Sequence, residues 1–161
     1  MINTKVTLAG VELKNSVMTA SGTFGSGAEY SEFVDLNKLG GVVTKGVANV
    51  PWPGNPTPRV TETASGMLNA IGLQNPGIDL FCKRDIPFLK QYDTKIIVNV
   101  CGKSTEDYCE VVERLAGATA VSVGTANFFN PYATVEIAEG IEKFMVQQKV
   151  EDISQIIGIV K

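Results

Sequence analysis

Histidine is absent from the 161 residues of this sequence, and its absence excludes several kinds of catalytic site. A Ser-His-Asp triad, a Cys-His nucleophile pair and a His-ligated metal site all need an imidazole. Only three cysteines occur, Cys82, Cys101 and Cys109, and none of them forms a C-x-x-C pair. We therefore expect reduced thiols, a cytoplasmic location and no metal site.

Long apolar runs and an excess of positive charge are also missing. No apolar run approaches the length of a membrane span, and the first ten residues, MINTKVTLAG, lack a basic region followed by an apolar one. The sequence thus predicts neither a signal peptide nor a membrane segment. Its net charge of −3 provides no electrostatic attraction for nucleic acid.

The chain does have enough apolar sequence for one globular domain, because 44% of its residues are apolar. Short apolar runs predict buried strands, and they alternate with segments that suit helices, as in βαβ units with a parallel sheet. The strands are expected at 17–20, 41–44, 95–100 and 119–123. The helices are expected at 29–36, 77–92 (with a break or kink at Pro87), 104–115, 132–148 and 153–157.

Turn residues and one helix cap add local detail. Alternation from Val6 to Leu13 predicts a hairpin that turns near Ala9 and Gly10. The proline-rich segment 51–58 excludes a helix, and a second small hairpin is expected over 59–69. Ser104 suits a helix N-cap, with Asp107 at the third position of a capping box.

A polar residue or a glycine ends each expected strand: Ser21, Lys45, Asn99 and the pair Gly124-Thr125. Ligands of parallel α/β folds bind at the carboxyl ends of the strands. Glycines there are ordinary turn residues. A lysine and an asparagine at the ends of apolar strands favour a ligand site instead.

Four segments together resemble the dihydroorotate dehydrogenase family. They are 20–25 (ASGTFG), 43–47 (VTKGV), 67–77 (MLNAIGLQNPG) and 121–128 (VSVGTANF). The motif NAIGLQN at 69–75 is similar to that of the catalytic subunit of the NAD-linked type B enzymes rather than to that of the fumarate-linked type.

The resemblance implies an α/β fold derived from a TIM barrel, which typically needs about 250 residues. Residues 1–116 are similar to the family's N-terminal part and residues 117–161 to its extreme C-terminus, so strands four to seven of the barrel are missing. The expected architecture is one truncated domain over residues 1–161, a half barrel of about four parallel strands with an N-terminal hairpin.

The resemblance also implies an activity and its partners. The family is a group of oxidoreductases of pyrimidine biosynthesis that oxidise dihydroorotate to orotate with FMN. In type B enzymes, a partner subunit with an iron–sulfur centre and FAD passes the electrons to NAD. The alternatives are a catalytically inactive FMN-binding or assembly fragment, and a product of recombination or of a faulty gene model that has no stable fold.

Site residues carried over from the resemblance fall into two groups. The residues expected to bind FMN are Ser21, Lys45, Gly46, Asn99, Gly124 and Thr125. Those expected to bind substrate are Lys45, Asn69, Ala70, Ile71, Gly72 and Leu73. A lysine cation suits both a reduced, anionic flavin and a substrate carboxylate, and a side-chain amide suits a pyrimidine edge.

The catalytic base of the family is a cysteine in a loop after the fourth strand, and no segment of this sequence matches that loop. Cys101 lies just past the third strand, but an unpaired cysteine is most often a small buried apolar residue. We therefore assign no catalytic residue. Cys82 and Cys109 fall on expected helices, where core packing is the default.

Two strand orders are compatible with the missing middle. The preferred one places the last strand beside the first, because an intact barrel closes there. The competing one places it beside the 95–100 strand as a surrogate fourth strand. Either order leaves two unpaired edges and one uncovered face, for which Val43, Val98 and Val121 are candidates, so a homo-oligomer is expected.

Overall fold

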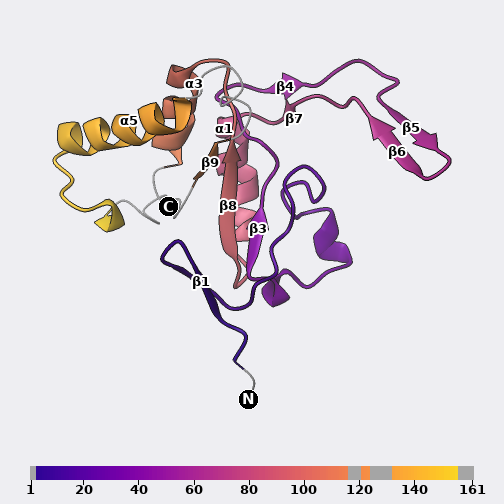
Figure 1. Cartoon of the computed structure of the whole chain (residues 1–161), viewed down its shortest axis with the longest axis horizontal. Coiled ribbons are helices and arrows are strands. Elements are labelled where there is room, and N and C mark those ends of the chain that lie inside the picture. The colour runs from indigo at the N-terminus through magenta and orange to yellow at the C-terminus, as the bar shows by residue number, and fades with distance from the viewer. Residues whose placement is uncertain (1–2, 116–120, 124–131, 156–161) are drawn as a thin grey trace.

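The computed structural model describes residues 3–115, 121–123 and 132–155, and a parallel three-stranded sheet lies at its centre (Figure 1). Strand β8 (Lys95–Val100) is in the middle, between β3 (Gly41–Val43) and β9 (Val121–Val123). The register aligns Val42 with Ile96, and Val98 with Val121. Three of the four predicted strands are thereby confirmed.

The first predicted strand, 17–20, is reduced to one parallel bridge between Met18 and Gly41. The main-chain N–H of Thr19 donates to Gly41 O at 3.2 Å, and the Thr19 hydroxyl accepts from Val43 N at 2.9 Å. The Thr19 hydroxyl thus accepts the hydrogen bond that a main-chain oxygen would accept in a regular parallel pair. The structure has three strands and a bridge where about four strands were expected, and the half barrel stays a prediction.

The position of β9 corrects the preferred strand order. β9 is hydrogen-bonded to β8, so the order along the sheet is β3-β8-β9, with the 17–20 segment next to β3. The chain leaves β8 through the ten-residue helix α3 (Thr105–Arg114) before it enters β9. Consecutive elements joined by short connections usually lie side by side, which explains why the competing order is the right one.

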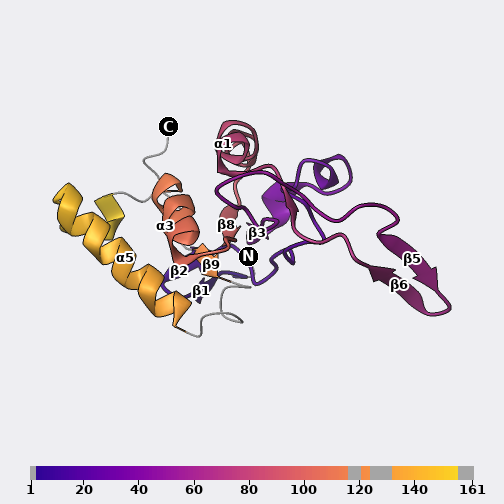
Figure 2. The ribbon, with the colours of Figure 1, turned by 90° about the horizontal axis from the view of Figure 1, so that it is seen from above.

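Helices cover one face of the sheet and form the main core. Val98 and Val100 of β8 are buried on that face against α1 (Ile78–Leu80), the π-helix η3 (Phe81–Asp85) and α3. Helix α5 (Ala133–Gln148) packs on α3, on the side away from β8 (Figure 2). Val98 was expected on the uncovered face and is instead 1% exposed in this core, which is a further correction.

The opposite face of the sheet carries Val43 and Ile97, which are aligned in the register and both half-buried. Asn99 follows Ile97 on this face, because side chains along a strand alternate. The side chain of Val121 lies outside the described residues. The face opposite the helices therefore carries Val43, with Ile97 in the place that was assigned to Val98, and its lack of a cover stays a prediction.

Helical segments agree with the sequence where a cap or a long apolar stripe specifies them. The Ser104 hydroxyl caps α3 by accepting from Asp107 N at 3.2 Å, as predicted. The 77–92 segment is α1, η3 and α2 (Ile86–Leu89). Pro87 lies in the first turn of α2, directly after the π-helix, and does not end the helical segment. The helix expected over 29–36 is wrong: two short 3-10 turns, η1 (Tyr30–Glu32) and η2 (Leu36–Lys38), take its place.

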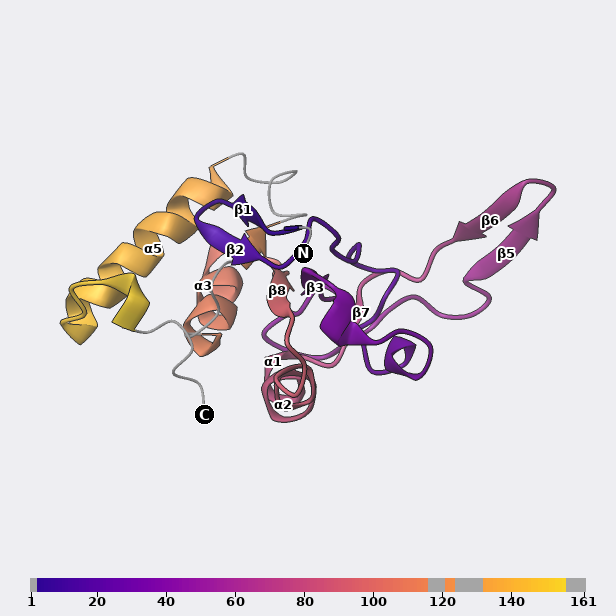
Figure 3. The ribbon, with the colours of Figure 1, turned by 90° about the horizontal axis from the view of Figure 1, so that it is seen from below.

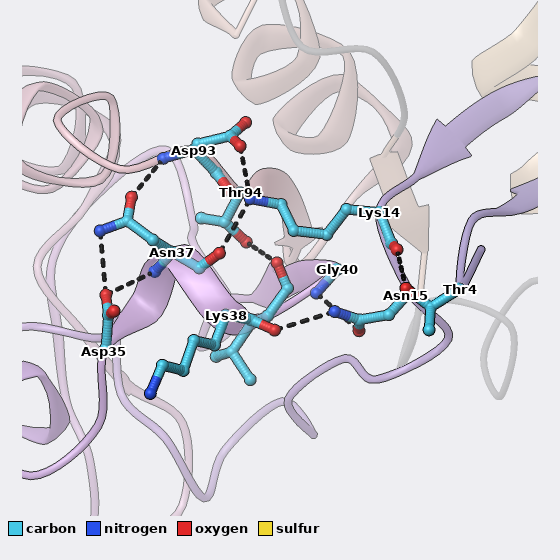
Figure 4. Close-up of polar contacts among 10 residues, drawn as sticks. Thr4, Lys14, Asn15, Asp35, Asn37, Lys38, Gly40, Asp93 and Thr94 are labelled. Atoms are coloured by element: carbon cyan, nitrogen blue, oxygen red, sulfur yellow. Dashed lines mark hydrogen bonds and ion pairs between the residues drawn. The ribbon is translucent and has the colours of Figure 1, made fainter. Parts of the chain in front are cut away.

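The N-terminal hairpin is confirmed as β1 (Val6–Leu8) and β2 (Val11–Leu13), with the turn at Ala9 and Gly10. Lys14 ties it to the body of the molecule (Figure 4). Its ammonium donates to Asn37 O at 2.9 Å and pairs with the Asp93 carboxylate at 2.6 Å. The Asn15 side chain adds a bond to Lys38 O at 2.8 Å.

A second hairpin, β5 (Val60–Thr63) and β6 (Gly66–Asn69), projects from the body as an arm (Figures 1 and 3). Its base is the short pair β4 (Trp52–Pro53) and β7 (Gln74–Asn75). Every residue from 60 to 70 is exposed, so the predicted hairpin forms but contributes no core. The last described element is η4 (Ile153–Gln155). None of the helices described is long and apolar enough to cross a membrane.

Candidate functional site

Three polar residues predicted from strand ends converge at the carboxyl edge of β3 and β8. The Ser21 hydroxyl donates to the main-chain oxygen of Thr44 at 2.7 Å, and the Asn99 side-chain amide donates to Ser21 Oγ at 2.9 Å. Lys45 follows Thr44 directly. Residues 21, 45 and 99 are far apart in the sequence, so the parallel sheet brings them together.

Thr44 holds this edge together and was not singled out from the sequence. Its side chain is fully buried, and its main-chain N–H continues the sheet by donating to Ile97 O at 2.9 Å. Its hydroxyl donates to Lys45 O at 3.1 Å and accepts from Asn99 N at 3.4 Å. A threonine at the end of an apolar strand was the available signal, because a buried hydroxyl needs partners.

The main chain of Lys45 is held by hydrogen bonds at both its oxygen, which accepts from the Thr44 hydroxyl, and its N–H. Its N–H donates to the main-chain oxygen of Gly25 at 3.1 Å. Its ammonium passes over Gly22, where a Cβ would lie 3.7 Å from Nζ. Gly22 has a φ of +86°, a conformation that side chains rarely adopt, so the glycine-rich loop folds under the lysine. The result is a cation placed at the carboxyl edge of β3, next to the loop that begins at Ser21.

Gly46 is enclosed by two side chains. A Cβ at this position would lie 2.4 Å from Cys101 Sγ and 3.1 Å from Leu73 Cδ1. Real carbon contacts lie near 3.5–4.0 Å, so only glycine fits without movement. Gly46 thus allows close packing beside Lys45 and places Leu73, a predicted substrate contact, next to this residue.

Cys101 is a packing residue in this geometry. Its side chain is 6% exposed, and its N–H donates to Val47 O at 2.8 Å. Burial raises the pKa of its thiol, while the nearby Lys45 ammonium acts in the opposite direction. A thiol must be ionised to remove a proton, so a raised pKa does not favour a catalytic base.

The remaining predicted substrate residues are divided between the site and the arm. Asn69 and Ala70 are exposed at the end of β6, where Ala70 N donates to Arg59 O at 2.8 Å. Ile71 and Gly72 lie beside Asn55, whose N–H donates to Ile71 O at 2.9 Å. Of this group, Leu73 is the one that reaches Gly46. The predicted FMN contacts Gly124 and Thr125 lie outside the described residues.

The fold and this edge define a class: a parallel β/α protein with a cation, an amide and a closely packed glycine at the carboxyl ends of its strands. Comparison with known proteins places it within that class. The family model of dihydroorotate dehydrogenase matches residues 3–116. The chain therefore belongs to the dihydroorotate dehydrogenase family.

Two relatives illustrate the match, both named "Dihydroorotate dehydrogenase B (NAD(+)), catalytic subunit". The one from Alkaliphilus metalliredigens is 56% identical over 156 residues, which are 96% of this chain and 51% of the relative. The one from Lachnoclostridium phytofermentans is 38% identical over 300 positions, covering 99% of this chain and 100% of the relative. Because the chain has 161 residues, at least 139 of those 300 positions (300 less 161) have no counterpart in it.

A solved structure gives the same fold at lower identity. The chain superimposes on a dihydroorotate dehydrogenase from Eimeria tenella, solved in complex with ferulenol, with a TM-score of 0.68 and 18% identity. The match covers 89% of this chain and 45% of that one. The chain thus spans about half the length of several proteins that it matches.

Proposed function

We propose that this chain carries one side of the FMN and dihydroorotate pocket of an NAD-linked type B dihydroorotate dehydrogenase catalytic subunit. The observation that carries the proposal is the convergence of Ser21, Lys45 and Asn99 at one sheet edge, beside the enclosed backbone of Gly46. Family membership and the names of the relatives support it.

The described residues fit one side of a flavin ring. Gly46 lets Cys101 and Leu73 pack against the backbone next to Lys45. Lys45 supplies a cation for a reduced, anionic ring. Among the described residues, none donates a hydrogen bond to Asn99 Oδ1, so this oxygen is available to a ligand. Hydride acceptance is the chemistry that FMN supplies when it is bound. We assign Ser21, Lys45, Gly46 and Asn99 to the ring, and Gly124 with Thr125 to the phosphate.

Substrate binding is proposed for Lys45 and for residues 69–73. Lys45 would pair with the dihydroorotate carboxylate, and Leu73 would present its apolar side chain beside Gly46. The 69–72 segment runs from the end of β6 toward β7, so we expect it to close over the substrate from the solvent side.

The chain does not account for proton removal. The family model ends at residue 116, and the 139 positions without a counterpart support the interpretation of two joined blocks, 1–116 and 117–161. The segment with the family's cysteine base falls in the missing part. Loss of a general base alone lowers a rate by about 10²- to 10⁴-fold. The isolated chain is therefore expected to bind FMN weakly and to turn over far below a full-length homologue.

One partner and a location follow from the proposed class. The electron acceptor is an iron–sulfur and FAD subunit that reduces NAD. The three unpaired thiols suit a reducing cytoplasm. The second candidate function is an FMN-binding or assembly fragment without catalysis. The burial of Cys101 and the raised pKa of its thiol favour this second function, because a buried, protonated thiol next to Lys45 does not act as a base.

The test measures binding and turnover separately. FMN is titrated into the chain by flavin fluorescence, and orotate formation is followed with an artificial electron acceptor, with and without the partner subunit. Lys45→Met should abolish FMN binding. Lys95→Met, at the amino end of the central strand β8, should leave FMN binding unchanged. No FMN binding by the wild type would refute the proposed pocket. Family-like turnover that Cys101→Ser abolishes would make Cys101 the base.

A further inference from the structure

Three groups at the ligand edge form a hydrogen-bonded chain with a defined direction. Ser21 Oγ lies 2.7 Å from the main-chain oxygen of Thr44, and the Asn99 amide nitrogen lies 2.9 Å from Ser21 Oγ. Thr44 is fully buried and held in the sheet by its bond to Ile97 O. Its carbonyl is therefore a fixed point from which the other two side chains are oriented.

Counting protons settles which end of the Asn99 amide faces Ser21. A main-chain carbonyl can only accept, so the single hydroxyl proton of Ser21 must lie on the line to Thr44 O. Ser21 Oγ then has only lone pairs for Asn99, and only the NH₂ end of an amide can donate to them. The reverse orientation would place two acceptor oxygens against each other.

The consequence is the polarity of the group offered to a ligand. With Nδ2 engaged by Ser21, the amide presents Oδ1, an acceptor that has no hydrogen-bond partner among the described residues. Asn99 lies on the sheet face opposite the helices, beyond Ile97 and near Lys45. A ligand there must present a donor to Oδ1, and an imide N–H between two carbonyls meets this requirement. Flavin and pyrimidine rings both contain one.

We propose that Ser21 is a positioning residue, which fixes the Asn99 amide with its oxygen toward the ligand and makes the site select an imide N–H. The proposal rests on the proposed function for the identity of the ligand. It refines the assignment of Ser21 to the flavin ring, because the hydroxyl proton is engaged by Thr44 O and one of the two lone pairs by Asn99 Nδ2, so Ser21 acts on the ligand through Asn99.

The first test needs no ligand. In the ¹⁵N-labelled chain, the Asn99 side-chain signal is assigned by its loss in Asn99→Ala. Ser21→Ala should shift this signal and speed its hydrogen exchange about fivefold, as expected for loss of one hydrogen bond. Ser21→Thr should restore the wild-type value. Thr23→Ala is the control, because that hydroxyl bonds only within its own loop, to Ala20 O. An unchanged Asn99 signal in Ser21→Ala would overturn the proposal.

The second test is a double-mutant cycle on ligand affinity, with FMN and orotate titrated separately. Ser21→Ala should raise the dissociation constant of the ligand that faces Asn99 about fivefold. In the Asn99→Ala background, the same change should have no further effect, because Ser21 acts through Asn99. Additive losses would mean that Ser21 touches the ligand itself and would refute the positioning role. If the wild type binds neither ligand, the proposed function fails and the amide signal alone decides on Ser21.

Discussion

Replacement of Gly46 by alanine tests the packing of the ligand edge directly. The added Cβ would lie 2.4 Å from Cys101 Sγ, so the sulfur must retreat by about 1 Å to reach normal contact. Cys101 is 6% exposed and its peptide is bonded to Val47, so the room for this movement is small. Overpacking of this kind costs about 1–3 kcal/mol. The reduced freedom of the unfolded chain offsets about 0.4–1 kcal/mol, and the expected net loss is about 1–2 kcal/mol.

Urea unfolding followed by circular dichroism measures this loss, and a second variant identifies its cause. Cys101→Ala removes the sulfur, so Gly46→Ala in that background should cost at least about 1 kcal/mol less than in the wild type. Gly66→Ala is the matched control, because its Cβ would meet nothing within 4 Å. The reasoning is refuted if Gly46→Ala is as mild as Gly66→Ala, or if Cys101→Ala gives no relief.

Four further predictions concern the rest of the molecule. Phe81→Ala, in the core, should lower the free energy of unfolding by about 3–5 kcal/mol, whereas Phe33→Ala, 83% exposed, should change it by less than about 0.5 kcal/mol. Ser104→Ala should cost about 1 kcal/mol through loss of the α3 cap, and an equal stability by denaturant titration would contradict this. The hydrogen bond and charge of Lys14 lower the pKa of the Asp93 carboxyl, so this pair stabilises the fold above the ordinary carboxyl pKa and loses its effect as pH falls through the lowered value. The stability difference between wild type and Asp93→Asn should therefore be present at pH 7 and shrink below about pH 4. Finally, the uncovered sheet face and edges predict self-association, and a sharp monomer peak in light scattering at micromolar concentration would count against it.

Local signals in the sequence determined much of the secondary structure. Alternation around Ala9 and Gly10 specified the first hairpin, and the hairpin expected over 59–69 also forms, as β5 and β6. The six-residue segment 95–100, four of whose residues are apolar, became β8 with the predicted bounds. Ser104 capped α3 because its hydroxyl meets a main-chain N–H three residues ahead, which is a local contact. The strand-end residues also indicated where Ser21 and Asn99 meet, because parallel strands bring their carboxyl ends together.

Tertiary structure decided what local patterns leave open. An apolar strand shows no contrast between its faces, so only packing against α1, η3 and α3 placed Val98 in the core. The neighbour of β9 depended on where α3 returned the chain, which no periodicity encodes. The pairing of Ser21 with Asn99 required two segments 78 residues apart to meet at one buried threonine. The sequence predicted that Ser21 and Asn99 lie at the carboxyl ends of the strands. Only the three-dimensional arrangement determined the direction of the hydrogen bonds between them and Thr44.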